Sequence, residues 1–167
     1  AICGALGAAL TCMMARRALD QKEFENQSEA LEKTISISEK LMEDFVNLLE
    51  KEARAKHTVR EVGGFVENSS NEEKLQAESI EKAYKEAAGV HLEILNAAED
   101  LIETAIFPVK NGNPGAITDA AAGAYMAWAA AGVAAMNIRL NISCVHDAGF
   151  IDKIMSETEF TLERMQS

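Results

Sequence analysis

The sequence is poor in proline, and this shortage favours helices. Only two prolines occur in 167 residues, Pro108 and Pro114, and both lie in one short segment. Because proline interrupts helices more strongly than any other residue, almost all of the remaining chain can be helical. The alternation of apolar and polar residues that is typical of strands is essentially absent. The sequence therefore predicts an all-α protein.

Basic residues are also scarce. The chain has 16 Lys and Arg residues against 27 Asp and Glu residues, which gives a formal net charge of −11. Binding to nucleic acid needs a basic surface, and no stripe of Lys and Arg with interleaved aromatic residues occurs. An anionic membrane surface is disfavoured for the same electrostatic reason. We therefore expect neither nucleic acid nor a membrane as a partner.

Cysteine and histidine are too few and too scattered to suggest a metal site. Cys3, Cys12 and Cys144 lack the spacing of metal ligands, so we interpret them as reduced thiols of a cytoplasmic protein. The histidines have no metal-ligand spacing either; they are His57, His91 and His146. Nucleophile elbows, phosphate loops and dinucleotide fingerprints are also absent from the sequence, which leaves covalent serine catalysis and nucleotide chemistry without support.

Two stretches lack charge, residues 1–15 and residues 120–136. The first has no basic flank before it, because Arg16 and Arg17 follow it, so it does not read as a signal peptide. The second has 17 residues, ten of them Ala, and is short for a membrane span. Small side chains let helix backbones approach closely. We therefore predict two central helices surrounded by protein.

The chain is expected to form one domain over residues 1–167, because its length and its 48% hydrophobic content suffice for one core. Five helices are predicted, over about 1–19, 28–62, 70–107, 118–143 and 150–165. Pro108 is expected to end the third helix, and Thr118 is expected to cap the fourth. Long helices with short connections predict an antiparallel bundle, with the Ala/Gly-rich first and fourth helices at its centre.

Polar residues lie on both sides of the uncharged stretch 120–136 in a distinctive order. They are Gly112-Asn113, Thr118-Asp119, Asn137-Ile138-Arg139-Leu140-Asn141 and Asp147. With the segments Ala5 to Leu10, Lys22 to Glu25 and Ala88 to Glu93, they resemble the cyclodeaminase/cyclohydrolase family of folate enzymes over nearly the whole chain. Members of that family carry Gly-Asn, then Ser-Asp opening an Ala-rich helix, then Asn-Val-x-Ile-Asn and a following Asp.

The sequence departs from the family pattern in three places. The family segment Asp-x-x-Ala-aromatic corresponds to the segment from Glu52 to Lys56, which keeps the carboxylate and loses the ring. His91 stands where Pro is usual. Family chains also carry a Pro-Gly-Gly-Gly turn before the first helix, whereas this sequence opens at Ala1. We therefore expect an N-terminal stretch, and with it part of the ligand site, to lie outside this sequence.

The resemblance implies an enzyme that acts on one-carbon-substituted tetrahydrofolate without a cofactor. Such an enzyme either releases ammonia from the 5-formimino form to close the methenyl ring, or hydrolyses that ring to the 10-formyl form. Carboxylates would move protons or stabilise cationic charge, and amides would recognise the pterin ring. We predict Asp119, Glu52 and Lys22 as catalytic residues, and Asn113, Asn137, Asn141 and Arg17 as substrate-binding residues.

Each of these residues also has a purely structural interpretation. Asp119 can complement the dipole of the helix that it opens, and Glu52 can form a surface ion pair with a basic neighbour. Asn137 and Asn141 can bond across helices and fix the register of the bundle. The basic residues Arg16, Arg17 and Lys22 can either guide an anionic folate tail or complement a helix end; Arg17 and Lys22 are the two predicted above as site residues.

Asp119 and Asn137 are 18 residues apart, so about 27 Å of helix separates them. One small pocket in one chain cannot use both directly, which leaves an extended site along the helix or a site shared in a dimer. A homodimer or larger assembly is also expected because one chain does not cover both small-residue helices completely. The alternative function is a non-catalytic acidic helical bundle that binds a partner or assembles with itself.

Overall fold

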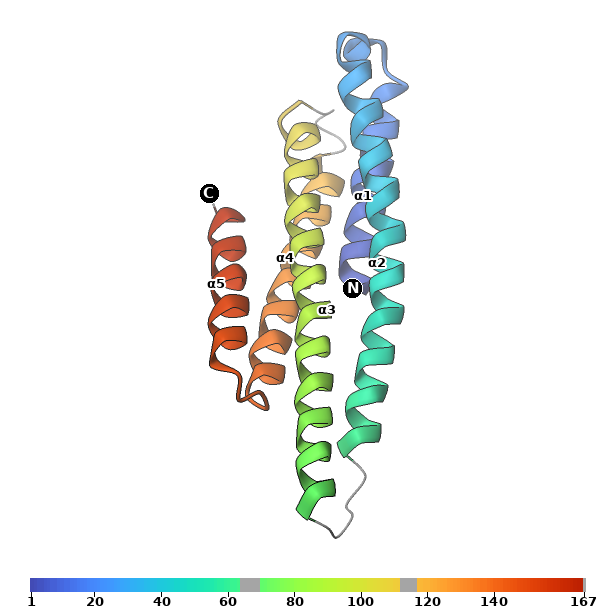
Figure 1. Ribbon diagram of the computed structural model, residues 1–167. Coiled ribbons are helices and arrows are strands. Elements are labelled where there is room, and N and C mark those ends of the chain that lie inside the picture. The colour runs from blue at the N-terminus through green and yellow to red at the C-terminus, as the bar shows by residue number, and fades with distance from the viewer. Residues whose placement is uncertain (64–69, 112–116, 167) are drawn as a thin grey trace.

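The computed structural model describes residues 1–63, 70–111 and 117–166, without the side chains of 70–74 and 108–111. Within these residues the chain forms five α-helices, one short 3-10 helix and no strand (Figure 1). The elements are α1 (Ile2–Leu19), η1 (Lys22–Gln27), α2 (Ser28–Gly63), α3 (Ser70–Asn111), α4 (Ile117–Ile142) and α5 (Ala148–Arg164). The predicted all-α fold is confirmed.

Two predicted helix ends differ from the structure. α3 continues past Pro108 to Asn111. A proline removes one backbone hydrogen bond and crowds the preceding turn, but the residues after it can still adopt helical angles. α4 begins at Ile117, so Thr118 lies inside its first turn and is not its cap. A cap residue stands before the first helical residue, and Thr118 is already helical.

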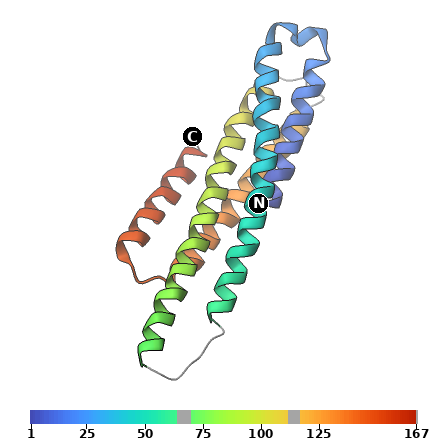
Figure 2. The same cartoon turned by 45° about the vertical axis from the view of Figure 1, so that its right-hand side comes forward.

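The two longest helices, α2 and α3, have 36 and 42 residues, or about 54 and 63 Å of length. They run side by side, with α1 packed along α2 and α4 packed along α3 (Figures 1 and 2). α1 and α4 also pack on each other, which completes a four-helix bundle. α5 lies outside this bundle, against α3 and α4.

Glycine allows α1 and α4 to approach closely. A Cβ atom added to Gly7 would lie 2.8 Å from the carbonyl oxygen of Gly123, and one added to Gly123 would lie 2.8 Å from the Thr11 hydroxyl. No side chain fits such distances without a shift of the neighbouring atoms. The close approach of the two small-residue helices is therefore observed.

The expectation that protein surrounds α1 and α4 on all sides is wrong. Each helix buries one face in the bundle and leaves large apolar side chains on the opposite face: Ile2, Leu6 and Met13 on α1, and Tyr125, Val133, Met136 and Leu140 on α4. We call these seven residues the α1/α4 apolar face. By length and composition alone, α1 and α4 could each cross a membrane, but buried core helices of soluble proteins pass the same test.

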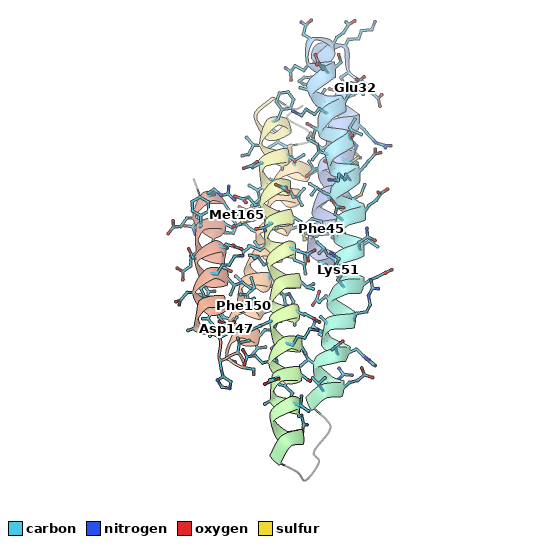
Figure 3. All side chains as sticks on the ribbon, viewed as in Figure 1. Glu32, Phe45, Lys51, Asp147, Phe150 and Met165 are labelled. Atoms are coloured by element: carbon cyan, nitrogen blue, oxygen red, sulfur yellow. The ribbon has the colours of Figure 1, made fainter. Side chains whose placement is uncertain are left out.

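α1 is only 18 residues long and accompanies the first half of α2. Phe45 of α2 is fully buried, and its ring packs where Gly4, near the start of α1, leaves room for it (Figure 3). The second half of α2 continues beyond the start of α1 and faces α3 and α4 (Figure 2). The bundle thus has four helices at one end and three at the other.

The start of α5 is fixed by Asp147, the last residue of the family pattern. Its Oδ1 atom caps the helix by accepting a hydrogen bond of 3.1 Å from the backbone N–H of Phe150. Its Oδ2 atom accepts a bond of 2.8 Å from Lys85 of α3, and the Lys85 ammonium lies 5.6 Å from the centre of the Phe150 ring. Asp147 therefore has a structural role, which joins α5 to α3.

Candidate active site

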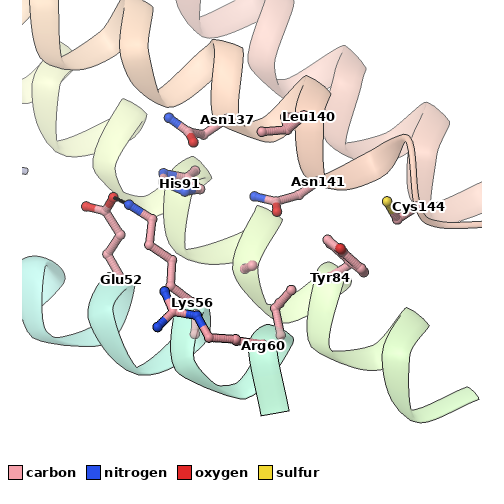
Figure 4. Close-up of a pocket in the computed structure, with 12 residues that line it drawn as sticks. Glu52, Lys56, Arg60, Tyr84, His91, Asn137, Leu140, Asn141 and Cys144 are labelled. Atoms are coloured by element: carbon pink, nitrogen blue, oxygen red, sulfur yellow. Dashed lines mark hydrogen bonds and ion pairs between the residues drawn. The ribbon is translucent and has the colours of Figure 1, made fainter. Parts of the chain in front are cut away.

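A pocket of about 390 Å³ lies between the second half of α2, the middle of α3 and the end of α4 (Figure 4). α2 contributes Glu52, Ala55, Lys56, Val59 and Arg60; α3 contributes Tyr84, Ala87 and His91; α4 and the turn after it contribute Asn137, Leu140, Asn141 and Cys144. On each helix these residues are three or four positions apart, so they share one face. The pocket lies at the three-helix end of the bundle, because α1 contributes no residue to it and α2 contributes residues from its second half.

Glu52 and Lys56 form an ion pair at the wall of the pocket. The Lys56 ammonium lies 2.6 Å from Glu52 Oε1, and the Glu52 side chain is only 16% exposed. Burial pushes the pKa of Glu52 upward, but the hydrogen bond and the charge of Lys56 outweigh it and hold the pKa below the ordinary value. Glu52 is thus an ionised carboxylate that is mostly shielded from solvent. Its ion pair with Lys56 therefore differs from an ordinary surface ion pair, in which both side chains are exposed.

His91 lies beside this pair and is 4% exposed. Burial lowers the pKa of its imidazole, because a charged ring is poorly solvated there. The carboxylate of Glu52 opposes this shift and the ammonium of Lys56 supports it. The imidazole is therefore uncharged at neutral pH, and in this form it can accept a proton.

The two predicted amides line the same pocket. The Asn137 amide donates a hydrogen bond of 2.8 Å to the backbone carbonyl of Val133, one turn earlier on its own helix. Among the described residues, the side chain of Asn141 has no hydrogen-bond partner. Within the described residues, neither amide forms a hydrogen bond to another helix. The structure therefore does not show these amides fixing the register of the bundle. The carbonyl oxygen of Asn137 and the whole amide of Asn141 are available to a ligand.

Asp119 and Arg17 lie at the other end of α4, outside this pocket. Arg17 Nη1 lies 3.0 Å from Asp119 Oδ2, and Arg16 pairs with Glu39 of α2. Lys22 is exposed at the start of η1. The predicted site residues therefore fall into two groups, with Glu52, Asn137 and Asn141 in the pocket and Asp119, Arg17 and Lys22 away from it. Asn113 lies outside the described residues.

Five polar residues of the pocket were not predicted as site residues: Lys56, Arg60, Tyr84, His91 and Cys144. Two of them, Lys56 and His91, are departures from the family pattern, and the structure places both beside Glu52. Tyr84 and Cys144 form a pair at the opposite wall, where a hydrogen bond with the thiol, and burial, raise the pKa of Tyr84. Within the described residues no cluster of three His, Cys, Asp or Glu side chains could hold a metal ion.

Comparison with known proteins identifies the family of the chain. The sequence pattern of the formiminotransferase-cyclodeaminase family matches residues 1–160, which is nearly the whole chain. The chain belongs to this family. A methenyltetrahydrofolate cyclohydrolase from Methylorubrum extorquens is 27% identical over 159 residues, which cover 95% of this chain and 76% of that protein.

The fold of the family is also found in a solved structure. A crystal structure of a formiminotetrahydrofolate cyclodeaminase from Thermotoga maritima superposes with a TM-score of 0.88 at 21% sequence identity. The match covers 99% of this chain and 78% of that chain. The chain therefore shares the helical-bundle fold of the Thermotoga maritima protein. At 21% identity, this likeness establishes the fold alone.

Proposed function

We propose that this protein acts on the one-carbon unit of a reduced folate, as a methenyltetrahydrofolate cyclohydrolase or a formiminotetrahydrofolate cyclodeaminase. Membership of the formiminotransferase-cyclodeaminase family supports this reaction class, and two similar proteins carry these two activities in their names. The observation that carries the proposal is the pocket in which Glu52, Asn137 and Asn141 meet, because α2 and α4 contribute these residues independently.

The pocket has the groups that both reactions need. In each, a nucleophile adds to an amidine-like carbon, N10 of the folate in the cyclodeaminase and water in the cyclohydrolase, and proton transfers let the adduct collapse. An ionised carboxylate such as Glu52 stabilises the cationic substrate, and a group with a pKa near neutrality moves the protons. Positioned side chains suffice for this chemistry, so we propose that no separate cofactor takes part.

The amides suit a pterin ring. Each amide offers a donor and an acceptor, and the edge of a pterin presents both in turn. A volume of about 390 Å³ is within the range of small-molecule sites and accommodates a bicyclic ring, with the remainder of the folate extending out of the pocket. Arg60 is exposed at the pocket and can meet an anionic part of the substrate.

We further propose that the α1/α4 apolar face binds a second copy of the chain. Its side chains are well exposed, for instance 51% for Val133 and 66% for Leu140. Large exposed apolar side chains that gather on one face are covered in most soluble proteins, and a two-fold axis is the commonest way to cover them. Leu140 belongs to both the apolar face and the pocket, so the partner would lie close to the site.

A two-fold axis across the helices would place the Asp119 end of one copy near the pocket end of the other. The same dimer would therefore reunite the two groups of predicted site residues, with Asp119, Arg17 and Lys22 supplied by the partner copy. Within one chain, about 27 Å of helix separates Asp119 from Asn137, so both cannot contact one small pocket. In this dimer, Asp119 of one copy could reach the pocket that contains Asn137 of the other. A homodimer is thus our proposal for the functional unit.

The deciding experiment follows the absorbance of the methenyl group with each substrate. A fall with methenyltetrahydrofolate shows the cyclohydrolase, and a rise with formiminotetrahydrofolate shows the cyclodeaminase. The alternative, a non-catalytic bundle, predicts no change with either substrate. It also predicts no shift of the melting temperature with folinic acid, whereas a ligand at 100 times its dissociation constant adds about 2.7 kcal/mol of stability.

A further inference from the structure

His91 is a buried titratable residue of the pocket that has no assigned role. Figure 4 shows its imidazole between the Glu52–Lys56 ion pair and the amides of Asn137 and Asn141. A ligand that reaches both the carboxylate and the amides must therefore pass against the imidazole. No hydrogen bond to another described residue occupies the ring.

The charged and titratable groups around His91 come from every neighbouring element. Glu52, Lys56 and Arg60 face the pocket from α2, Tyr84 comes from α3 and Cys144 from the turn after α4. Glu52 is the carboxylate in this set, and it favours the protonated ring.

Glu52 itself is a poor proton acceptor. One of its oxygens already accepts a hydrogen bond of 2.6 Å from the Lys56 ammonium, and its pKa lies below the ordinary carboxyl value. A general base works best when its pKa is near the working pH, which is the range of imidazole and not of an ion-paired carboxylate. The two residues are therefore suited to different tasks.

We propose that His91 is a catalytic residue that carries the protons of the reaction, while Glu52 stabilises the positive charges that arise beside it. The inference rests on the proposed function. In the hydrolytic direction, water adds to the methenyl carbon and gives one proton to the His91 imidazole. The neutral adduct then forms the formyl C=O bond as its C–N5 bond breaks. N5 receives the proton from the imidazolium, and the hydroxyl proton of the adduct leaves to solvent.

The same residue serves the deaminating direction. The substrate reacts as its protonated formimino cation: N10 attacks the formimino carbon, the C=N electron pair moves to the formimino nitrogen and leaves a neutral amino group there, and N10 gives its proton to the imidazole. The imidazolium then protonates the amino group of the adduct as the C–N bond breaks, so that ammonia leaves and the methenyl cation remains. In both directions His91 accepts a proton first and donates it second. The ionised Glu52 stabilises the imidazolium in between.

The test compares His91→Gln with His57→Gln. His57 lies on α2 outside the pocket, where its side chain is exposed. Its Nδ1 atom lies 3.2 Å from Glu61 Oε2. We expect His91→Gln to lower kcat by about 10²-fold or more, the usual contribution of a general acid–base group, with a smaller change in KM. We expect His57→Gln to leave both unchanged.

The pH profile separates a catalytic from a structural role. In the wild-type enzyme kcat should fall as the pH drops through the pKa of His91, below the ordinary value of about 6.5, because the base becomes protonated. This acid limb should be absent from the residual activity of His91→Gln. His91→Asn provides a second substitution, and circular dichroism shows whether each variant is folded.

Two results would overturn the inference, and they are distinguishable. An active wild-type enzyme whose folded His91→Gln and His91→Asn variants keep kcat and the acid limb would refute the role of His91 and leave the proposed function intact. A wild-type protein that is folded but inactive with both substrates would refute the proposed function and the role of His91 together.

Discussion

Lys56 holds the carboxylate of Glu52 from one helical turn further along α2, with 2.6 Å between its ammonium nitrogen and Glu52 Oε1. The Lys56 side chain is 58% exposed whereas the Glu52 side chain is 16% exposed, so the pair extends from the surface to the pocket wall. The position of Lys56 is the one at which the family pattern has an aromatic ring. The pair fixes both the orientation and the ionisation of Glu52.

Removing the ammonium should therefore change the working pH of the enzyme. In Lys56→Met the pKa of Glu52 should rise, because burial remains while the hydrogen bond and the attraction are lost. The acid limb of kcat should move to higher pH, because the charge of Lys56 no longer lowers the pKa of His91. The matched control is Lys51→Met, since Lys51 pairs with Glu93 at the same distance of 2.6 Å outside the pocket. Identical pH profiles for both variants would show that Lys56 does not set the pKa of the group behind the acid limb, His91.

Mixing two inactive variants tests the shared site. Asp119→Asn and Glu52→Gln should each lose most of their turnover as homodimers, if Asp119 acts in the pocket of the partner. After dissociation and random reassembly, half of the dimers contain one intact site, so activity should return to roughly a quarter of the wild-type value. Full activity of Asp119→Asn alone would leave Asp119 as an ion-pair partner of Arg17. Inactive variants that do not complement each other would place Asp119 and Glu52 in the same chain's site.

The dimer itself is tested by a charge in the α1/α4 apolar face. Val133→Glu should give a monomer, because an unpaired charge in a covered apolar interface costs several kcal/mol. Phe160→Glu is the control, since Phe160 is 60% exposed on α5, away from this face. Sedimentation velocity separates the two states. A wild-type protein that already sediments as a monomer would disprove the interface.

The contact between α1 and α4 predicts opposite effects for two glycines of one helix. Gly123→Ala should destabilise the protein by about 1–3 kcal/mol, the usual cost of overpacking, because its Cβ would meet Thr11 and the carbonyl of Gly7. Gly132→Ala should stabilise it by about 0.5–1 kcal/mol, since no atom lies within 4 Å of its added Cβ and alanine is the better helix former. Urea unfolding measures both. Equal effects would show that α1 and α4 are not in close contact.

His91 should also make stability depend on pH. Its pKa is lowered on folding, so below about 6.5 the unfolded chain binds a proton that the folded protein does not. Stability should therefore fall as the pH drops from about 6.5 to the folded pKa of His91. The pKa of Glu52 is lowered as well, and its contribution is lost at more acidic pH, as the carboxyl protonates in the folded protein. Unfolding curves of His91→Gln should lack the first decrease, whereas those of His57→Gln should keep it.

The fold was predictable because its signals are local. The proline shortage, the apolar periodicity and the polar connections mark five helices whose observed bounds differ by a few residues. The errors at Pro108 and Thr118 concern helix ends, where one residue more or less changes the free energy little. The close approach of α1 and α4 also follows from composition, because only small side chains permit it.

The pocket was only partly predictable because three helices assemble it. Spacing within α4 placed Asn137 and Asn141 on one face, but nothing in the sequence related that face to Glu52 on α2. Whether the two faces meet depends on how far α2 and α4 are shifted along each other in the bundle, which local sequence patterns do not give. His91 was not predicted as a site residue because metal-type spacing relates only residues close in sequence, and the groups around His91 are distant in sequence. Its partners Glu52 and Asn137 are 39 and 46 residues away along the chain.

The difference in length between α1 and α2 also divides the molecule into two regions of unequal dynamics. Backbone amides at the four-helix end, around Phe45 and Thr11, lie inside helices whose side chains are fully buried there, and should exchange with deuterium only on global unfolding. Amides near Arg60 and Tyr84 lie at the end with fewer neighbouring helices and should exchange by local opening. The substrate would bind at the more mobile end, so a bound folate should slow exchange there and leave the other end unchanged. The molecule would then tighten around its ligand without any change in the rigid half that keeps it folded.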